Sequence, residues 1–448
     1  MGLGERLKQS AARVNGPVDA SASEAPPEVF HDLKGELHRR LVDKLDLATI
    51  QKLPPERLQD ELRSILGAMV SDAKLPLNQA ERDRMVQDIL HDVTGLGPLE
   101  PLLADATISD ILVNTYSTVY IERTGKLELT RVRFDSDEHL MQVINRIVSR
   151  VGRRIDETSP MVDARLRDGS RVNAIIPPLA IDGPVLSIRR FGVRPLQVRD
   201  LLTLGSVTPE ALGFMGACVQ AKLNVLVSGG TGSGKTTMLN ALSAFIPATE
   251  RVVTIEDSAE LQLQQPHVVR LETRPPNIEG KGEILARDLV RNSLRMRPDR
   301  IIVGEVRGPE VLDMLQAMNT GHEGSMTTVH ANSPRDALTR MEAMVGMAGV
   351  PLSEQATRQT IARGINVIVQ LTRGVDGRRR LASIAEITGI EGATIVMQEL
   401  YRFDQRGVDA QGRVVGEYVA TGIRPKVLER IERAGLDPAK VLEAHVRG

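Results

Sequence analysis

The chain has 448 residues, and its 57 lysines and arginines almost balance its 58 aspartates and glutamates, which gives a formal net charge of −1. This balance excludes binding of nucleic acid through bulk electrostatics. The single cysteine, Cys218, excludes a disulfide scaffold and any multi-cysteine metal site within one chain. Tryptophan is absent, and six phenylalanines and four tyrosines are too few to suggest a base-stacking surface. The length predicts two to four domains.

We expect no secretory signal at the N-terminus, because charged residues interrupt the stretch from 1 to 15. The longest apolar runs, such as 365–371, are far shorter than the roughly 20 residues of a membrane helix. We therefore expect a soluble, cytoplasmic protein that meets a membrane only through partners.

Residues 1–28 are rich in alanine, serine, glycine and proline, which predicts a disordered tail. Residues 29–98 follow a helical pattern and predict a small helical bundle, for which we favour an interaction or spacer role. A second helix is expected to begin at Pro54-Pro55, and a third to be capped by Asn78 and stopped by Gly95. The first helix would carry four leucines spaced by four residues: Leu33, Leu37, Leu41 and Leu45.

Residues 99–195 predict a separate α/β domain, followed by a hinge linker over 196–205. The span 146–199 contains eleven arginines, no lysine and five acidic residues. Arginine suits bidentate contacts with phosphate, although a solvated basic face would have the same composition. Strands are expected over 108–113, 118–122, 171–177 and 184–191, and an amphipathic helix over 139–151.

Residues 206–448 alternate strands and helices, which predicts an α/β domain with a parallel sheet covered on both faces. The apolar strand 224–228 leads directly into the motif G-x-x-x-x-G-K-[ST], and a helix follows over 237–245. This is a P-loop, whose N–H groups and helix start bind phosphate, so ATP and Mg²⁺ are the expected cofactors. Lys235 should reach the β- and γ-phosphates, and Thr236 should bind Mg²⁺. The nucleotide-binding candidates are Gly229, Gly230, Thr231, Gly232, Ser233, Gly234, Lys235, Thr236 and Thr237.

Acidic residues follow two further strands of this domain. The strand 251–255 leads into Glu256 and Asp257, and the strand 300–304 leads into Glu305. Carboxyl ends of parallel strands face the ligand crevice, so one carboxylate should act on a water and another should support Mg²⁺. Beyond them, His322 and His330 bracket a segment rich in glycine and threonine that suggests a phosphate sensor, and the absence of a third ligand argues against zinc.

These four motifs, in this order, resemble those of the secretion-ATPase superfamily, which powers type II secretion, type IV secretion and type IV pili. The resemblance covers roughly 99–430. After the P-loop it includes an acidic box, TIEDSAE at 254–260, an atypical Walker B segment, RMRPDRIIVGEVRG at 295–308, and a histidine box at 321–332. It implies a RecA-like P-loop ATPase core with a preceding PAS-like α/β domain, assembled as a homohexamer.

The resemblance also implies site roles by position. Glu260 is the first candidate for activating water and Glu256 the second, while Glu305 would support Mg²⁺ and the water. His330 would sense the γ-phosphate, with His322 left open. Arginines of the preceding domain would reach the nucleotide, and the candidates are Arg171, Arg189 and Arg190, with Arg291 and Arg295 as further ones.

Within the superfamily, segments 108–114, 119–123 and 161–173 resemble the Tad/Cpa (tight-adherence) pilus assembly ATPases. One cysteine excludes the tetracysteine zinc module of type II secretion ATPases, and the added bundle differs from dedicated retraction motors. The implied function is a hexameric motor at the inner face of the cytoplasmic membrane. ATP binding and hydrolysis would close its domains and drive assembly, and optionally retraction, of a Tad-type type IV pilus through inner-membrane platform proteins.

Other functions stay open at this point. The first alternative is a VirB11-like type IV secretion ATPase, although those lack the long N-terminal extension. A nucleic-acid-dependent ring motor would share the core but conflicts with the charge and the few aromatics, so no nucleic-acid partner is expected. A regulator that binds ATP without hydrolysing it conflicts with the intact Lys235, Glu260 and Glu305.

Overall fold

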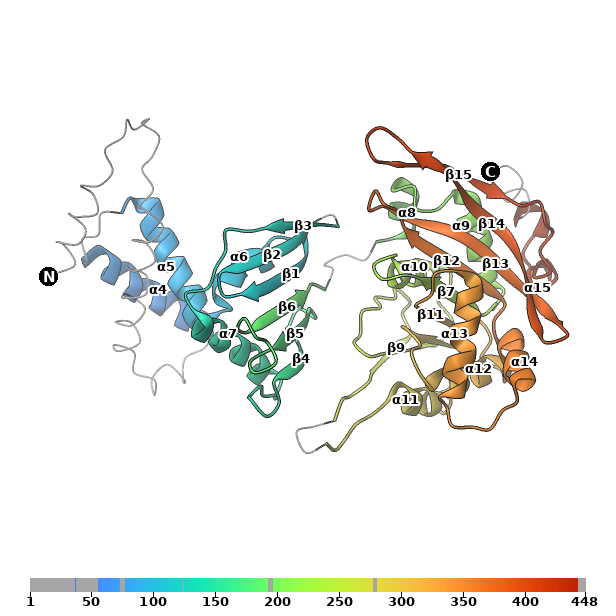
Figure 1. The fold of residues 1–448 in the computed structure, drawn as a ribbon, viewed down its shortest axis with the longest axis horizontal. Coiled ribbons are helices and arrows are strands. Elements are labelled where there is room, and N and C mark those ends of the chain that lie inside the picture. The colour runs from blue at the N-terminus through green and yellow to red at the C-terminus, as the bar shows by residue number, and fades with distance from the viewer. Residues whose placement is uncertain are drawn as a thin grey trace. The chain divides into compact units, whose positions relative to one another are not determined.

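The fold is described from a computed structural model of the chain, which describes residues 37, 55–72, 77–123, 125–191, 196–276 and 280–441. The chain divides into two compact units, Met1–Phe191 and Gly192–Gly448, whose elements are labelled in Figure 1. Each unit is treated by itself. No helix in the described ranges combines the length and the apolar character that a membrane span requires.

The first unit begins with α4 (Pro55–Asp72) and α5 (Gln79–Thr94). The cap predicted at Asn78 is confirmed: its side chain accepts the N–H of Glu81, whose carboxylate accepts the N–H of Asn78. The stop predicted at Gly95 is confirmed as well. Of the four leucines predicted on the first helix, only Leu37 lies within the described residues. It is helical and packs in an apolar cluster with α4 and α5.

Six antiparallel strands form the sheet of the first unit, in the order β3-β2-β1-β6-β5-β4. Helix α7 packs its apolar residues against one face of this sheet. It begins two residues before the predicted start, because Ser136 caps it by accepting the N–H of His139. The remaining elements are η1 (Gly97–Leu99), α6 (Glu100–Ala104), β1 (Ile108–Thr115), β2 (Thr118–Arg123), β3 (Lys126–Leu129), α7 (Asp137–Arg150), β4 (Met161–Arg165), β5 (Arg171–Ile175) and β6 (Val185–Arg189).

The second unit contains a nine-stranded sheet in the order β15-β14-β13-β12-β7-β11-β10-β8-β9. The strands from β12 to β9 in this order are parallel neighbours, whereas β13, β14 and β15 continue antiparallel from β12. The prediction of a purely parallel sheet is therefore wrong for the C-terminal third. The strands are β7 (Val225–Gly229), β8 (Val252–Glu256), β9 (Val268–Glu272), β10 (Arg300–Val303), β11 (Met326–Val329), β12 (Val367–Arg373), β13 (Arg379–Glu391), β14 (Thr394–Val408) and β15 (Val414–Ala420).

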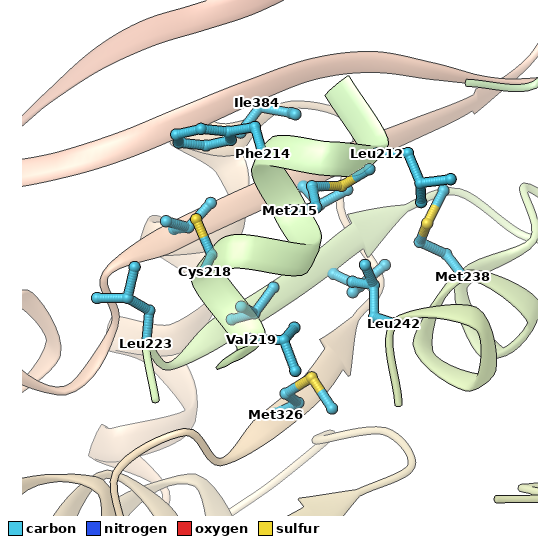
Figure 2. Close-up of a cluster of buried hydrophobic side chains, with 14 of the residues drawn as sticks. Leu212, Phe214, Met215, Cys218, Val219, Leu223, Met238, Leu242, Met326 and Ile384 are labelled. Carbon is cyan, nitrogen blue, oxygen red and sulfur yellow. The ribbon is translucent and has the colours of Figure 1, made fainter. Parts of the chain in front are cut away.

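Helices cover both faces of this sheet, as predicted. One apolar cluster joins the sheet to α8, α9, α10 and α15, and a second joins the opposite face to α11, α12, α13 and α14. Figure 2 shows the first cluster, where Met215 and Val219 of α9 lie near Leu242 of α10. The helices are α8 (Val198–Thr203), α9 (Pro209–Gln220), α10 (Lys235–Ser243), α11 (Ala286–Ser293), α12 (Glu310–Asn319), α13 (Pro334–Gly346), α14 (Glu354–Gly364) and α15 (Leu428–Arg433).

The segment predicted as a linker, 196–205, is not uniformly extended. It contains α8, and the buried Leu201 of this helix belongs to the core of the second unit. Hydrophobic burial therefore attaches the end of the segment to that unit.

Candidate nucleotide site

The loop between β7 and α10 is shaped by its glycines. Gly232 and Gly234 have φ values of +68° and +95°, which residues with side chains rarely adopt. A Cβ on Gly229 would lie 2.9 Å from the carbonyl oxygen of Leu371, so this position also needs glycine. The result is a tight turn that passes at once into a helix N-terminus, which is the arrangement that binds phosphate.

The first turn of α10 presents a cation and two hydroxyls at this loop. The Lys235 ammonium donates hydrogen bonds to the carbonyl oxygens of Gly229 and Gly230, at 3.0 and 3.1 Å. Thr236 and Thr237 follow it and are half-buried, while Thr231 is exposed in the loop. The lysine charge adds to the partial positive charge of the helix start, so the site favours a polyanion.

A hairpin from distant sequence contacts the same loop. Arg379, the first residue of β13, donates through Nε to the carbonyl oxygen of Gly232 at 2.9 Å. Its Cδ lies 3.5 Å from the Cβ position of Gly234, so the aliphatic stem covers that glycine. Arg373, the register partner of Arg379 on β12, brings Nη1 to 3.3 Å from the Cβ position of Gly232. Neither arginine was among the predicted site residues.

Glu256, at the end of β8, lies inside the protein. It is 6% exposed, and its Oε2 accepts the N–H groups of Glu260 and Leu261 at 2.8 and 2.9 Å. Burial raises the pKa of this carboxyl, and those two hydrogen bonds and the charge of Arg270 only partly offset the effect. Glu256 thus shapes the acidic box from within, whereas Glu260 is half-buried and nearer to solvent.

Acidic side chains gather where β8 and β10 end on one edge of the sheet. These strands are parallel neighbours in register, so Asp257 and Glu305 follow them on the same side. Arg307 joins the two: its Nε donates to Glu305 Oε2 at 2.7 Å, and its Nη1 lies 3.5 Å from Asp257 Oδ2. Burial lowers the pKa of Arg307, but the hydrogen bond to Glu305 and the nearby acidic charges outweigh burial and raise it overall. Arg307 was not among the predicted site residues.

The two histidines lie at opposite ends of β11. His330 follows the strand, and because β11 runs parallel to β7, it lies on the edge that carries the P-loop. Beyond it, Asn332 Oδ1 is 4.0 Å from the Cβ position of Gly230. His322 precedes the strand, where its carbonyl oxygen accepts a hydrogen bond from Ser325. The structure therefore brings His330 to the loop and places His322 on the opposite edge.

The donor set at this edge fits Mg²⁺. In the part of the chain that the structure describes, no three histidine, cysteine, aspartate or glutamate side chains gather as a metal cluster. Magnesium bound with a nucleotide does not need one, because it takes few protein oxygens and keeps water and phosphate oxygens as its other ligands. The Thr236 hydroxyl and the Glu305 carboxylate are oxygens of this kind.

Sequence comparison places the chain in a family. Residues 92–412 match the family model described as Type II/IV secretion system protein. The chain belongs to this family.

Several relatives extend the match. A Mycobacterium tuberculosis protein named for conjugal transfer is 41% identical over 307 residues, which cover 67% of this chain and 87% of that protein. The conjugal transfer protein TrbB of Rhizobium radiobacter is 33% identical, over 69% of this chain and 90% of that protein. A crystal structure of the VirB11 ATPase from the Brucella suis type IV secretion system, in complex with sulphate, is 29% identical over 64% of this chain and 94% of that chain, with a TM-score of 0.35.

In this secretion-family chain, three arginines occupy neighbouring strands of the first unit. Arg165, Arg171 and Arg189 are register partners across β4, β5 and β6. The row continues onto β1 with a carboxylate, because Asp110 is the other register partner of Arg189. Arg190 differs, because its Nη1 donates to the carbonyl oxygens of Asp105 and Ile108. These two bonds hold the Arg190 guanidinium against the loop that precedes β1.

The arginines before the Walker B strand lie away from the P-loop of their own unit. Arg291 pairs with Asp313 at 2.7 Å, and Arg287 contacts the same carboxylate. Arg295 follows α11 and precedes β10, so it lies at the amino end of that strand, opposite to Glu305. The structure therefore does not bring Arg291 and Arg295 to the P-loop edge.

Proposed function

We propose that this chain hydrolyses ATP with Mg²⁺ and acts as a motor of a type II/IV secretion machinery. The observation that carries the proposal is one sheet edge on which the P-loop, Glu260, Glu305 and His330 lie together. A P-loop alone binds nucleotide, and the carboxylates add groups that can hold and deprotonate a water.

Each residue has a separate part in this proposal. Lys235 leaves the loop carbonyls and binds the β- and γ-phosphates, and Thr236 gives an oxygen to Mg²⁺, which when bound neutralises phosphate charge. Glu260 accepts the proton of the attacking water, and Glu305, held by Arg307, orders that water. His330 senses the γ-phosphate from the end of β11. Glu256 is the second choice as base, because it is buried and its Oε2 is occupied.

The assembly that we infer is a homohexamer of RecA-like domains, each preceded by a PAS-like domain, in which ATP binding and hydrolysis drive domain closure. Arg171, Arg189 and Arg190 are our candidates for phosphate contacts from the first unit. Arg171 and Arg189 are register partners in one row with Arg165, and neighbouring guanidinium groups can bind phosphate oxygens in a bidentate manner. We infer an interaction role for residues 29–98 and a linker role for 196–205.

The machinery that we propose is a Tad-type pilus at the inner face of the cytoplasmic membrane, driven through inner-membrane platform proteins. Its support is the resemblance of segments 108–114 and 161–173. The second candidate is VirB11-like type IV secretion or conjugal transfer, favoured by the names of the relatives at 41% and 33% identity. Cells that lack the gene distinguish the two candidates. Loss of pili with unchanged plasmid transfer supports the pilus motor, and loss of plasmid transfer with normal pili supports the second candidate.

Steady-state turnover of the purified chain tests the enzymatic proposal. We expect Mg²⁺-dependent ATP hydrolysis that single-stranded DNA does not change and that Lys235→Ala abolishes together with nucleotide binding. Turnover that appears only with DNA would instead support a nucleic-acid motor. Nucleotide binding without turnover, also in the presence of membranes containing the platform proteins, would favour a regulator.

A further inference from the structure

We propose that Gln370 of β12, the strand beside that of the P-loop, is a positioning residue for ATP turnover, which links the end of β12 to the segment that follows β11 and so acts through His330. The inference rests on the hydrolytic function proposed above. It starts from a buried amide whose hydrogen-bonding capacity is only partly used.

Gln370 lies near the end of β12 and is 4% exposed. Its register partner on β7 is Ser228, the residue directly before the P-loop glycine Gly229. Leu226 and Ile368, two positions earlier on the two strands, both belong to the core that α11–α14 cover. Because side chains alternate along a strand, Ser228 and Gln370 face that same side of the sheet.

The amide of Gln370 contacts the segment that follows His330 and the end of its own strand β12. Its Nε2 donates to the carbonyl oxygens of Ala331 and Leu371, each at 3.3 Å. Ala331 directly follows His330, and Leu371 is the register partner of Gly229. One side chain therefore connects the residue after His330 with the strand end beside the P-loop.

The acceptor side of this amide is unused. Gln370 Oε1 and Ser228 Oγ are buried, and neither has a hydrogen-bond partner among the residues that the structure describes. A buried polar atom without a partner destabilises a fold, and an apolar side chain of similar size would avoid that penalty. The two donor bonds satisfy backbone carbonyls, but the acceptor end adds an unpaired buried atom, so stability alone gives little reason for glutamine at this position.

A role in turnover does give a reason. Both donor bonds of Gln370 are at the long end of the usual range, and its acceptor is spare, so the amide can change partners when the segment 330–332 moves. Asn332 of that segment already lies beside Gly230. When a γ-phosphate draws His330 toward the P-loop, the neighbouring Ala331 moves with it. Gln370, on the strand that flanks β7 on the side away from β11, would guide this movement through its bond to Ala331.

The test replaces the amide by an apolar side chain of similar length, Gln370→Met, with Gln370→Leu measured in parallel. The matched control is Gln398→Met, because the Gln398 amide donates to Glu386 in the antiparallel part of the same sheet. We expect the melting temperature to fall slightly at most, because removal of the unpaired acceptor offsets the loss of the two donor bonds. We also expect kcat to fall by about ten-fold or more, while KM and the Kd for ADP stay within about two-fold of wild type. Gln398→Met should retain wild-type turnover.

A second readout is independent of turnover. In the wild type, a non-hydrolysable ATP analogue should slow hydrogen exchange over 329–333 more than ADP does, and this difference should vanish in Gln370→Met. Wild-type kcat and wild-type exchange in both Gln370 variants would overturn the inference and leave the proposed function intact. A wild-type chain without turnover would instead overturn the proposed function, and the inference with it.

Discussion

At the scale of single residues, Glu256 shows how burial decides a carboxyl's role. Burial raises its pKa above the ordinary value of 4.5, so the folded protein holds this proton more tightly than the unfolded chain does. The stability that the group contributes is therefore fully present below pH 4.5 and is lost as the pH rises through the raised pKa. Above that pH the fold carries a buried charge.

This sign gives a prediction for Glu256→Gln, which keeps one oxygen to accept the N–H groups of Glu260 and Leu261. We expect the variant to gain stability relative to wild type as the pH rises from 5 to 8, by about 1.4 kcal/mol for each unit of raised pKa. Thermal unfolding at several pH values measures this. Glu429→Gln, on α15 beside Arg433, is the control and should follow wild type. A difference that shrinks with rising pH would contradict the account.

Local sequence carries only part of the site. The P-loop could be predicted because all of its residues are contiguous and their spacing is fixed by one turn and one helix start. The sequence could not predict that only one of the two histidines lies near the P-loop. An interval of eight residues does not reveal that a four-residue strand lies between them and places them on opposite edges of the sheet. Burial of Glu256 and the pairing of Arg307 with Glu305 likewise depend on packing that no local pattern contains.

At the scale of elements, the hairpin of β12 and β13 supports the P-loop. Asp376 and Arg380 form an ion pair within it, and Asp376 also accepts the N–H of Val414 in the neighbouring β15. Both partners of the pair are nearly buried. These contacts hold the hairpin in place and so keep Arg379 bonded to the carbonyl oxygen of Gly232. The P-loop needs such outside contacts, because its glycines have no side chains that could pack.

We therefore predict that Arg379→Ala weakens ATP and ADP binding about equally, by about three- to ten-fold, because a hydrogen bond from a charged but exposed donor is lost. At saturating ATP, kcat should stay close to wild type, since Arg379 contacts the loop and not the reacting atoms. Calorimetric titration and steady-state kinetics measure the two effects. Arg378→Ala, one residue earlier in the turn, removes the same charge and should bind as wild type does. Equal affinities for Arg379→Ala and wild type would refute this role.

The hairpin also marks where the prediction of a parallel sheet failed. The apolar run 365–371 does not by itself distinguish a buried strand from a buried helix. The antiparallel pairing of β13–β15 follows from long-range register, and 147 positions separate Arg379 from Gly232. The helix caps and the strand that leads into the P-loop were predictable because their signals lie within a few residues.

At the scale of the whole molecule, the catalytic proposal rests on the second unit, and the row of arginines lies in the first. The family match extends over both units, from residue 92 to residue 412. Glu305 is the residue on which the proposed hydrolysis depends most, because it follows the Walker B strand β10, pairs with Arg307 and lies on the sheet edge that carries the P-loop.

The most direct test compares steady-state ATP turnover of wild type, Glu305→Gln and the control Glu429→Gln, with ADP affinity measured on the same samples. We predict that Glu305→Gln lowers kcat by about 100-fold or more and leaves ADP affinity within about three-fold, because the carboxylate acts on the water and not on the bound nucleotide. Glu429→Gln should match wild type in both. Unchanged turnover in Glu305→Gln would contradict the central claim that this sheet edge hydrolyses ATP.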